Sequence, residues 1–304
     1  MSSLSQASSA WPEFSYTDFE STGYLLHRLL QGIGKLKLTT PFEPHWANVA
    51  LWLTARGLTT GPIPYHSMTF TIEIDFIAQQ LQCSNSLGQF DGFSLQSCSV
   101  AETISLLFKT LKGISVELVI NPMPQEVPHP IAFDQDTTLR IYHPELALNW
   151  WQILKSTHQV LKRYHAKFKG ISPPVGLMWG TMDLRDARYK GSGVPVKPGS
   201  NIIDRNAWDD VQVESGWWAG SEMYPKPAFF SLAFPLPAEL EKLSIKPKTA
   251  SWNNELKEFL LDYADLRLSK NPDEDLLEFF ESTYLAASEL MGWDEKLITS
   301  GKPI

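Results

Sequence analysis

Apolar residues recur at three- and four-residue intervals along several stretches of this chain, which is the spacing of an amphipathic helix. These stripes predict four helices, over residues 17–33, 99–113, 144–168 and 271–292. Thr17 and Glu20 form a capping box at the start of the first helix, and we expect Gly32 and Gly34 to end it. The helices are therefore long enough to cover one face of a sheet.

Alternation of apolar and polar residues predicts β-strands between these helices. The clearest strand is 70–76, where Phe70, Ile72, Ile74 and Phe76 alternate with polar residues. Shorter apolar runs lie near residues 81 and 93, and further strands are expected at 49–54, 116–120, 175–183, 211–218, 228–234 and 258–263. One-sided burial is what antiparallel sheets permit, so the pattern indicates an α+β fold.

The order of helix, strands and helix occurs twice, which predicts two similar halves packed as one unit. Each half is expected to be an antiparallel sheet flanked by helices. The final helices end alike, with LKG at 111–113 and LMGW at 290–293, and this suggests an internal pseudo-repeat. The predicted boundaries are a first half over 11–120, a Pro-rich connector over 121–144 and a second half over 145–294.

Composition narrows the class of protein. With 304 residues, 43% of them hydrophobic, the chain can bury a large core. The net charge of -8 argues against nucleic acid as a partner, and no apolar run reaches the ~20 residues of a membrane span. Cys83 and Cys98 have no CxxC spacing, which favours reduced thiols and a cytoplasmic location. The composition does not show which oligomeric state the protein has or which cofactor, if any, it uses.

Several runs of the sequence resemble a known family. They are TARGLTTGPIPY, FTIEIDF, MPQEVPHPIAFD, MWGTMDL, GWWAG and ESTYLAASELMGWD, in order between residues 11 and 294. Together they are similar to an uncharacterised, mainly bacterial family, domain of unknown function 5996. The resemblance implies a histidine three positions before the Trp of the MWG run and another before the GWWAG run. Gly176 and Asp210 stand at these places here, so any site that those histidines form in relatives is altered in this chain.

Some histidines and carboxylates are candidates for catalytic or metal-binding groups. His158 and His165 lie seven residues apart on one helix face, which is too far for one ion, so core positions are favoured. Glu73 and Asp75 share the polar face of one strand and are expected to face water. Asp183 ends an otherwise apolar strand face, so it is either held by a nearby arginine or used in a site.

Two arginine-bearing turns occupy corresponding places in the halves. In TARGLTTGPIPY, Arg56 and Trp52 share one strand face, and His45 precedes this strand. In LRDARYKGSGVP, Arg185 and Arg188 follow Trp179 and Asp183. If the halves pack about a local two-fold axis, these turns flank one cleft that recognises a small anionic ligand through guanidinium groups. The alternative interpretation is that TARGLTTGPIPY is only a stiff turn.

Two classes of function remain open from sequence. One is a binding protein or enzyme with an aromatic-walled cleft, in which His45, Trp52, Arg56, Trp179, Asp183, Arg185 and Arg188 are the candidate ligand-binding residues. The other is a non-catalytic scaffold that serves a protein partner. The sequence contains no GxSxG, Walker, GxGxxG or HExxH motif, so it identifies no reaction.

Overall fold

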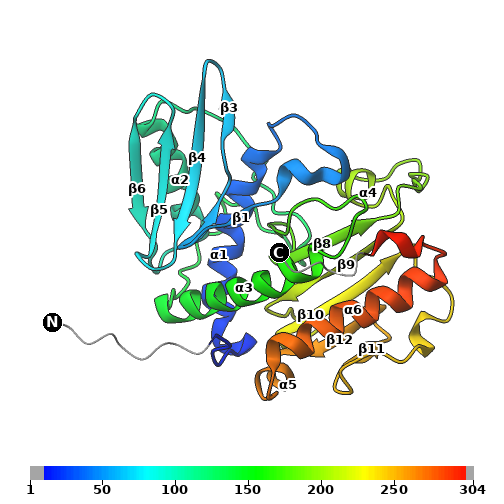
Figure 1. The fold of residues 1–304 in the computed structure, drawn as a ribbon. Helices are drawn as coiled ribbons and strands as arrows, with labels where there is room; N and C mark the ends of the chain where they lie inside the picture. Colours follow the sequence, from blue (N-terminus) through cyan, green and yellow to red (C-terminus); the bar gives the residue numbers. More distant parts are fainter. Residues whose placement is uncertain (1–9, 299–304) are drawn as a thin grey trace.

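The computed structural model describes residues 10–298, and the first part of the chain folds as helix, strands and helix (Figure 1). Its elements are α1 (Tyr16–Lys37), the 3₁₀ helix η1 (Pro44–Val49), β1 (Trp52–Leu53), β2 (Gly57–Thr59), β3 (Ile63–Tyr65), β4 (Met68–Asp75), β5 (Gln80–Asn85), β6 (Phe90–Ser94) and α2 (Val100–Gly113). The capping box of Ser99 and Glu102 opens α2, where the sequence predicts a helix over 99–113.

The second part begins with another long helix after the Pro-rich segment. Its elements are α3 (Pro144–His165), β7 (Gly176–Met178), β8 (Asp183–Tyr189), α4 (Ile202–Ala207), β9 (Gln212–Trp218), β10 (Ala228–Phe234), η2 (Leu240–Lys242), β11 (Ser251–Asn253), β12 (Glu258–Asp262), α5 (Tyr263–Arg267), α6 (Pro272–Leu290) and η3 (Glu295–Leu297). The order of α3, strands and α6 repeats that of the first part.

Within residues 10–298 the strands form two six-stranded sheets, and every strand pair is antiparallel. The first sheet has the order β1-β2-β4-β5-β6, with β3 paired to β4, and the second has the order β11-β12-β10-β9-β8-β7. Helices α3 and α6 pack against strands of the second sheet, and α2 packs against β6 of the first. The α+β class predicted from one-sided alternation is confirmed.

The two sheets meet edge to edge. Leu51 N donates to the Leu177 carbonyl at 2.9 Å, and Leu177 N donates back to Leu51 at 2.8 Å. This bridge places β1 of the first sheet beside β7 of the second. We call this line of contact the seam.

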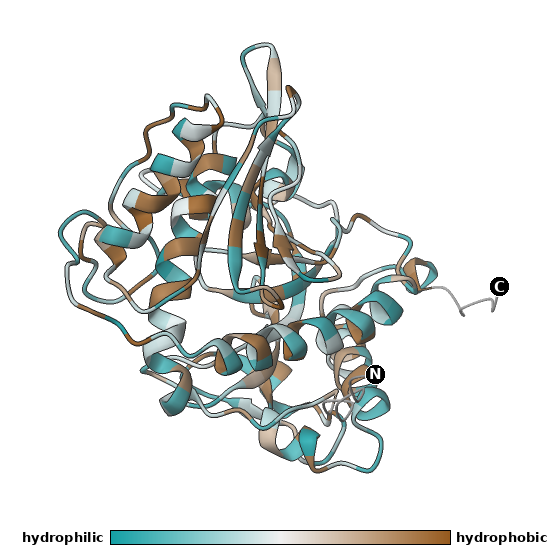
Figure 2. Ribbon diagram, turned by 90° about the vertical axis from the view of Figure 1, so that its left-hand side faces the viewer, coloured by the Kyte–Doolittle hydropathy of each residue, from teal (hydrophilic) through white to brown (hydrophobic). Residues whose placement is uncertain are grey.

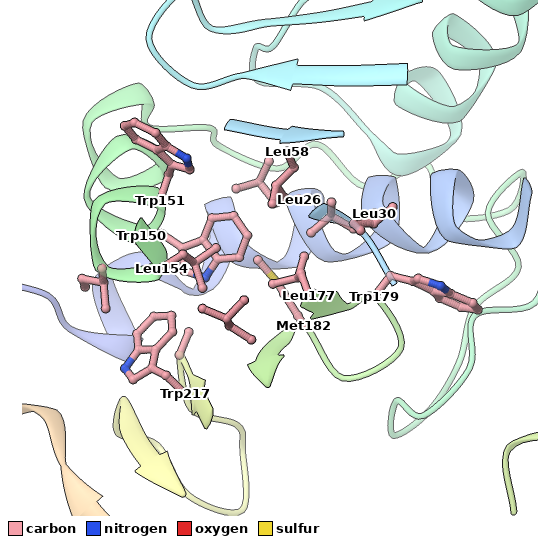
Figure 3. Close-up of a cluster of buried hydrophobic side chains, with 14 of the residues drawn as sticks. Leu26, Leu30, Leu58, Trp150, Trp151, Leu154, Leu177, Trp179, Met182 and Trp217 are labelled. Carbon is pink, nitrogen blue, oxygen red and sulfur yellow. The ribbon is translucent and has the colours of Figure 1, made fainter. Parts of the chain in front are cut away.

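Apolar side chains from both parts meet under the seam. Figure 3 shows Leu26 and Leu30 of α1, Trp150 of α3, Leu177 of β7 and Trp217 of β9 in one cluster. Leu30, Trp150, Leu177 and Trp217 have no measurable exposure. Because one continuous core lies beneath both sheets, the two parts pack as a single unit.

Helix α1 is longer than the sequence suggested, and two expectations about its ends are wrong. Its N-cap is Ser15, whose hydroxyl accepts from Asp18 N at 3.4 Å, and not the Thr17/Glu20 box. The helix also continues through Gly32 and Gly34 to Lys37. A Cβ at Gly32 would press on Ile104, and one at Gly34 would overlap the Trp179 ring. These glycines therefore allow close packing and do not end the helix.

Two strand predictions also need correction. Residues 116–120 form no strand, and Val119 is 94% exposed, because the alternating segment has no partner strand. The segment LRDARY, expected to be a turn, is strand β8, which pairs with β7 and β9. Its charged residues concealed it, since only the structure shows that Arg185 pairs with Glu214 of β9 and that Asp186 pairs with His165 of α3.

The distribution of polar and apolar residues agrees with this layered arrangement. Figure 2 shows hydrophobic and hydrophilic positions interleaved along the helices and strands, as expected for elements with one buried and one solvated side. In the described part of the chain, no helix has both the length and the apolar composition needed to cross a bilayer.

Candidate functional site

A pocket opens at the seam, between η1 and β1 on one side and β7 and β8 on the other. It is a hollow open to solvent, and its enclosed part has a volume of about 20 Å³, room for about one water molecule. Its lining residues, which come from both parts of the chain, are His45, Trp46, Ala47, Ala50, Trp52, Pro173, Pro174, Gly176, Met178, Arg185 and Ala187. We call it the seam pocket.

Gly176 lets the two sheets approach at this place. A Cβ built on it would lie 2.8 Å from the Ala50 Cβ and 3.0 Å from Cζ3 of Trp52. Both distances are shorter than comfortable van der Waals contact. The resemblance to the family implies a histidine at this position, and in this chain the glycine leaves the pocket wall to Ala50 and Trp52.

The backbone of η1 turns His45 into the pocket wall. His45 and Trp46 have φ values of 60° and 56°, in the left-handed region that costs a non-glycine residue about 1–2 kcal/mol. The His45 ring stacks on the Tyr189 ring, with centroids 3.8 Å apart and planes at 17°. Strain at two consecutive residues, held against an aromatic partner, marks a segment whose conformation is fixed by its surroundings.

Strand β8 forms the floor of the seam pocket. Arg185, Ala187 and Tyr189 share its outer face, which is the face of the second sheet opposite α3 and α6. Ala187 is buried and small, so it leaves room between the longer side chains of Arg185 and Tyr189. The pocket therefore lies above Ala187, between the guanidinium group of Arg185 and the stacked rings of His45 and Tyr189.

Several polar atoms beside this floor are buried and have no hydrogen-bond partner. They are His45 Nδ1, Tyr189 OH, Asp209 Oδ1 and Gln212 Oε1. Tyr189 is 1% exposed and Gln212 is fully buried. Tyr189 and Gln212 are direct neighbours across β8 and β9. Buried polar groups are normally satisfied by protein or by ordered water, so each of these atoms needs a hydrogen-bond partner that the described residues do not supply.

Acidic residues surround the one arginine of the pocket. Arg185 Nη1 pairs with Oε1 of Glu214, which lies on the neighbouring strand β9. Burial disfavours the charged guanidinium, but Glu214, followed by Tyr189 and Asp183, raises the pKa of Arg185 overall. Burial also raises the pKa of Asp183 and of Glu214, although Arg185 opposes both shifts. The arginine is thus firmly charged and already has one partner.

Two further glutamates extend this acidic group. Gln31 of α1 clamps the Pro-rich connector by bonding both backbone polar groups of Gln125, at 2.6 and 2.7 Å. The clamp holds Glu126 with its carboxylate against Gly180. Burial, and next the charge of Asp183, raises the pKa of Glu126 to about 7. Burial likewise raises the pKa of Glu258, on β12, to about 8.

The structure brings three of the seven sequence-predicted site residues together in the seam pocket: His45, Trp52 and Arg185. Asp183 lies on the same strand face as Arg185 and accepts from the Thr181 hydroxyl. Trp179 is buried elsewhere, over Gly34 of α1, and donates to the Val49 carbonyl at 3.1 Å.

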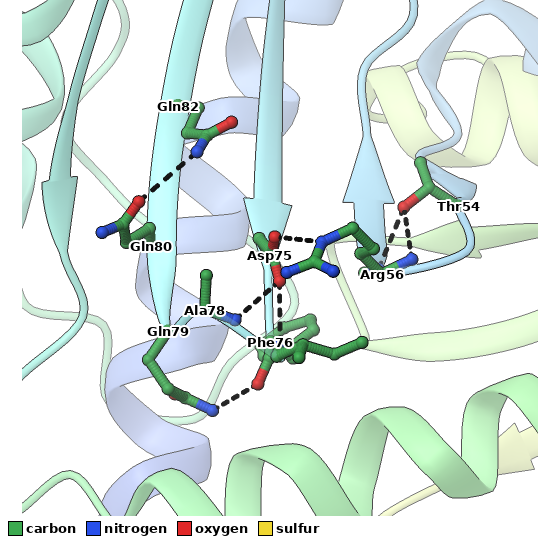
Figure 4. Close-up of polar contacts among 10 residues, drawn as sticks. Thr54, Arg56, Asp75, Phe76, Ala78, Gln79, Gln80 and Gln82 are labelled. Atoms are coloured by element: carbon green, nitrogen blue, oxygen red, sulfur yellow. Dashed lines mark hydrogen bonds and ion pairs between the residues drawn. The ribbon is translucent and has the colours of Figure 1, made fainter. Parts of the chain in front are cut away.

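Arg56 and Arg188 lie outside the seam pocket. Figure 4 shows Arg56 directly before β2, where its Nε donates to Asp75 at 2.5 Å and its side chain is 55% exposed. Arg188 points to the helix-covered face of β8, where its Cζ lies 3.5 Å from the Tyr164 ring centroid. Thr54 Oγ1 accepts from the backbone N–H groups of Arg56 and Gly57, as expected of a well-ordered turn.

Tyr189, Gln212, Asp209 and Glu126 were not among the residues predicted from sequence. Gln212 lies in a predicted strand and Tyr189 in a segment expected to be a turn, and only their pairing across β8 and β9 reveals them. Among the described residues, no group of three or more His, Cys, Asp and Glu side chains has an arrangement that could hold a metal ion.

Fold and site together define an α+β protein with a pocket between two antiparallel sheets. The chain belongs to the family of unknown function DUF5996, whose profile matches residues 11–300. No curated protein and no solved structure shows a significant match to the chain.

Proposed function

We propose that this protein binds a small molecule in the seam pocket. The pocket combines aromatic and proline walls with a few polar groups, which is the usual composition of a ligand site. Its enclosed part is about 20 Å³, so the ligand would lie mainly in the part of the pocket that is open to solvent.

One observation carries the proposal: His45 is held in a strained conformation in the pocket wall with a buried nitrogen that has no partner. A structural turn has no need of such a residue, because glycine would adopt the same backbone without strain. A histidine kept there, stacked on Tyr189, presents its imidazole to an occupant.

Arg185 is the group expected to contact an acceptor on the ligand. Its guanidinium has five N–H donors, and Glu214 engages only part of them. A carboxylate or another anionic group on the ligand is the natural second partner, as paired arginine–carboxylate bonds are strong and directional. The anionic ligand expected from sequence is therefore retained as a proposal, centred on Arg185 and without Arg56 or Arg188.

A substitution that fills the pocket tests the proposal. Ala187→Leu places a larger side chain on the floor, and Phe42→Ala serves as the control because Phe42 is 57% exposed and is not part of the pocket lining. Native mass spectrometry and a thermal-shift screen of metabolites should find a compound bound by wild type and Phe42→Ala but not by Ala187→Leu. If every compound that binds wild type also binds Ala187→Leu equally well, the pocket is not the binding site. A wild type that binds none favours the scaffold alternative.

A further inference from the structure

The Pro-rich connector closes on itself as a compact loop. Phe133 N donates to the Pro122 carbonyl at 2.9 Å, which ties the two ends of the loop together. Pro124 and Phe133 are buried, whereas residues 128–131 are exposed. We call residues 122–133 the strap. Its ends are anchored in the protein and its middle faces solvent.

We propose that the strap is a pH-sensitive latch, which docks on the turn between β7 and β8 in acid and is released as Glu126 loses its proton. The turn spans residues 179–182 and leads directly into β8. Release of the strap would free this turn and the adjoining acidic end of β8 for other contacts. No strap residue lines the seam pocket.

Helix α1 holds both the strap and the turn through His27, Gln31 and Lys35, which are spaced four residues apart on one helix face. His27 Nε2 donates to the Gly180 carbonyl at 2.8 Å, and Gln31 bonds both backbone polar groups of Gln125. Lys35 Nζ donates to the Gln125 side chain at 3.3 Å. Burial is the main cause that lowers the pKa of His27 to about 4, so His27 stays neutral from about pH 5 upward.

Glu126 brings the carboxylate of the strap onto the turn. Its backbone is left-handed, at φ 55°. The three atoms nearest to a Cβ built at Gly180 all belong to the Glu126 side chain, so the carboxylate occupies the place that a side chain at residue 180 would fill. Glu126 as a whole is exposed, so its carboxyl group can exchange protons with solvent.

Acidic groups from three elements act on the Glu126 carboxylate. They are Asp183 at the start of β8, Glu214 of β9 and Asp204 of α4, and Arg185 is the opposing charge. Arg185 already pairs with Glu214. Like charges that share one site disfavour full ionisation, so docking is favoured when Glu126 is protonated and opposed when it is ionised. The raised pKa of Glu126, caused mainly by burial and next by Asp183, has the same direction.

The proton on Glu126 couples docking to pH in one direction. Glu126 has a pKa of about 7 in the docked strap, and a released strap returns it to the ordinary value of 4.5. Between these values the docked state holds a proton that the released state has lost. The docking equilibrium therefore weakens by up to about tenfold per pH unit over this range and levels off above about pH 8.

Hydrogen exchange, followed by mass spectrometry between about pH 5 and pH 8, tests the latch. The readout is the protection factor, which compares each measured rate with that of the free peptide at the same pH and so removes the intrinsic effect of pH. The Gln125 and Phe133 amides are both hydrogen-bonded in the docked strap. In wild type, strap protection should fall by about tenfold or more relative to that of helix α2, the internal reference.

Two variants isolate the carboxylate. Glu126→Gln keeps a neutral side chain, so its strap should stay protected relative to α2 across the whole pH range. Gly180→Ala places a Cβ where the carboxylate lies, and Gly180 is not among the residues with positive φ, so its backbone accepts alanine. Its strap should be poorly protected even at about pH 5. Glu117→Gln is the control, because the Glu117 side chain is 73% exposed, and it should follow wild type.

Each departure from these results overturns the latch. A constant ratio of strap to α2 protection in wild type between about pH 5 and pH 8 excludes it. A fall in Glu126→Gln equal to that in wild type would assign the titration to another group. Equal strap protection in Gly180→Ala and wild type at about pH 5 would mean that the carboxylate does not hold the strap on the turn. Circular dichroism of each variant establishes that lost protection is not a lost fold.

Discussion

The imidazole of His45 lies flat on the phenol ring of Tyr189, with ring centroids 3.8 Å apart, although the two residues come from different halves of the chain. His45 reaches this position only because its backbone is left-handed, at φ 60°. The stack therefore couples a local strain in η1 to the outer face of β8. Relief of the strain and loss of the stack are separable by mutation.

The stabilities of His45→Gly and His45→Ala should differ in the opposite direction from the usual one, in which glycine is less stable than alanine. Both variants lose the stack on Tyr189, worth about 0.5–1.5 kcal/mol for an aromatic pair. Only glycine relieves the left-handed strain, so we expect His45→Gly to be more stable than His45→Ala by about 1 kcal/mol. Urea denaturation measures the free energy of unfolding of each variant.

The control for this comparison is two residues away. Ala47 belongs to the same short helix and is not among the residues with positive φ. Ala47→Gly should therefore destabilise the protein by about 0.5–1 kcal/mol, the ordinary cost of glycine. If His45→Ala proves more stable than His45→Gly, the left-handed conformation of His45 is not present in solution.

Most of the fold could be predicted from the sequence, because each of its helices and strands buries one face. The alternation at Phe70, Ile72 and Ile74 identified β4 and its polar side, and the stripe in α3 identified the second long helix. Strand β8 was missed because four of its seven residues are charged. Charged residues are stable in a buried strand only when other elements supply their partners, and a sequence does not show those partners. The duplication suggested by the two halves stays a prediction.

Only part of the candidate site could be predicted from the sequence. His45 and Trp52 were identified because they lie at the end of a strand or in an adjoining segment, where pockets form. Arg185 was identified on the expectation of a turn, although its segment is strand β8. Tyr189 and Gln212 were not identified, because only the folded structure shows that each has a buried oxygen without a hydrogen-bond partner. Arg56 was a plausible ligand group by sequence, but Asp75 lies nineteen positions later in the chain and only the antiparallel β2–β4 pairing brings it to the guanidinium.

Gly34 should tolerate no side chain. A Cβ there would overlap the Trp179 indole, which is buried and anchored by its bond to Val49. We expect Gly34→Ala to lower the free energy of unfolding by about 1–3 kcal/mol, the usual cost of overpacking, despite the better helix propensity of alanine. Glu20→Ala, at an exposed position of the same helix, should change it by less than about 0.5 kcal/mol. Equal stability of Gly34→Ala and wild type would show that α1 and Trp179 are not in this contact.

Glu258 should make the protein less stable as pH rises. Its pKa is about 8 in the folded protein, raised mainly by burial from the ordinary value of 4.5. Between these values the folded state holds a proton that the unfolded chain has lost, so stability falls with rising pH. The slope is at most about 1.4 kcal/mol per pH unit for one group. Glu126, with a pKa of about 7, acts in the same direction below neutrality.

Thermal unfolding of Glu258→Gln measures this contribution. Between about pH 6 and pH 8 the melting temperature of wild type should fall more steeply than that of the variant, which has no proton to lose. Glu255→Gln, at an exposed position in the turn between β11 and β12, is the control and should follow wild type. Parallel curves for wild type and Glu258→Gln would mean that Glu258 is ionised in the folded protein across this range.

The Arg185–Glu214 pair should behave as a buried ion pair whose two members are not equivalent. Their side chains are 12% and 7% exposed, so removing one partner leaves a desolvated charge. Arg185→Met should cost about 3–5 kcal/mol, because Glu214 and Asp183 then share no cation. Glu214→Gln should cost less, because Arg185 keeps the nearby charge of Asp183.

The double variant should be less destabilised than the sum of the two single variants, with a coupling energy of at least about 1 kcal/mol. The exposed pair Lys242–Glu239, at 2.8 Å, is the reference, and its cycle should give a coupling below about 1 kcal/mol. Additive effects at Arg185 and Glu214 would mean that the guanidinium makes its main contact elsewhere, and the charge arrangement of the seam pocket would need to be redrawn.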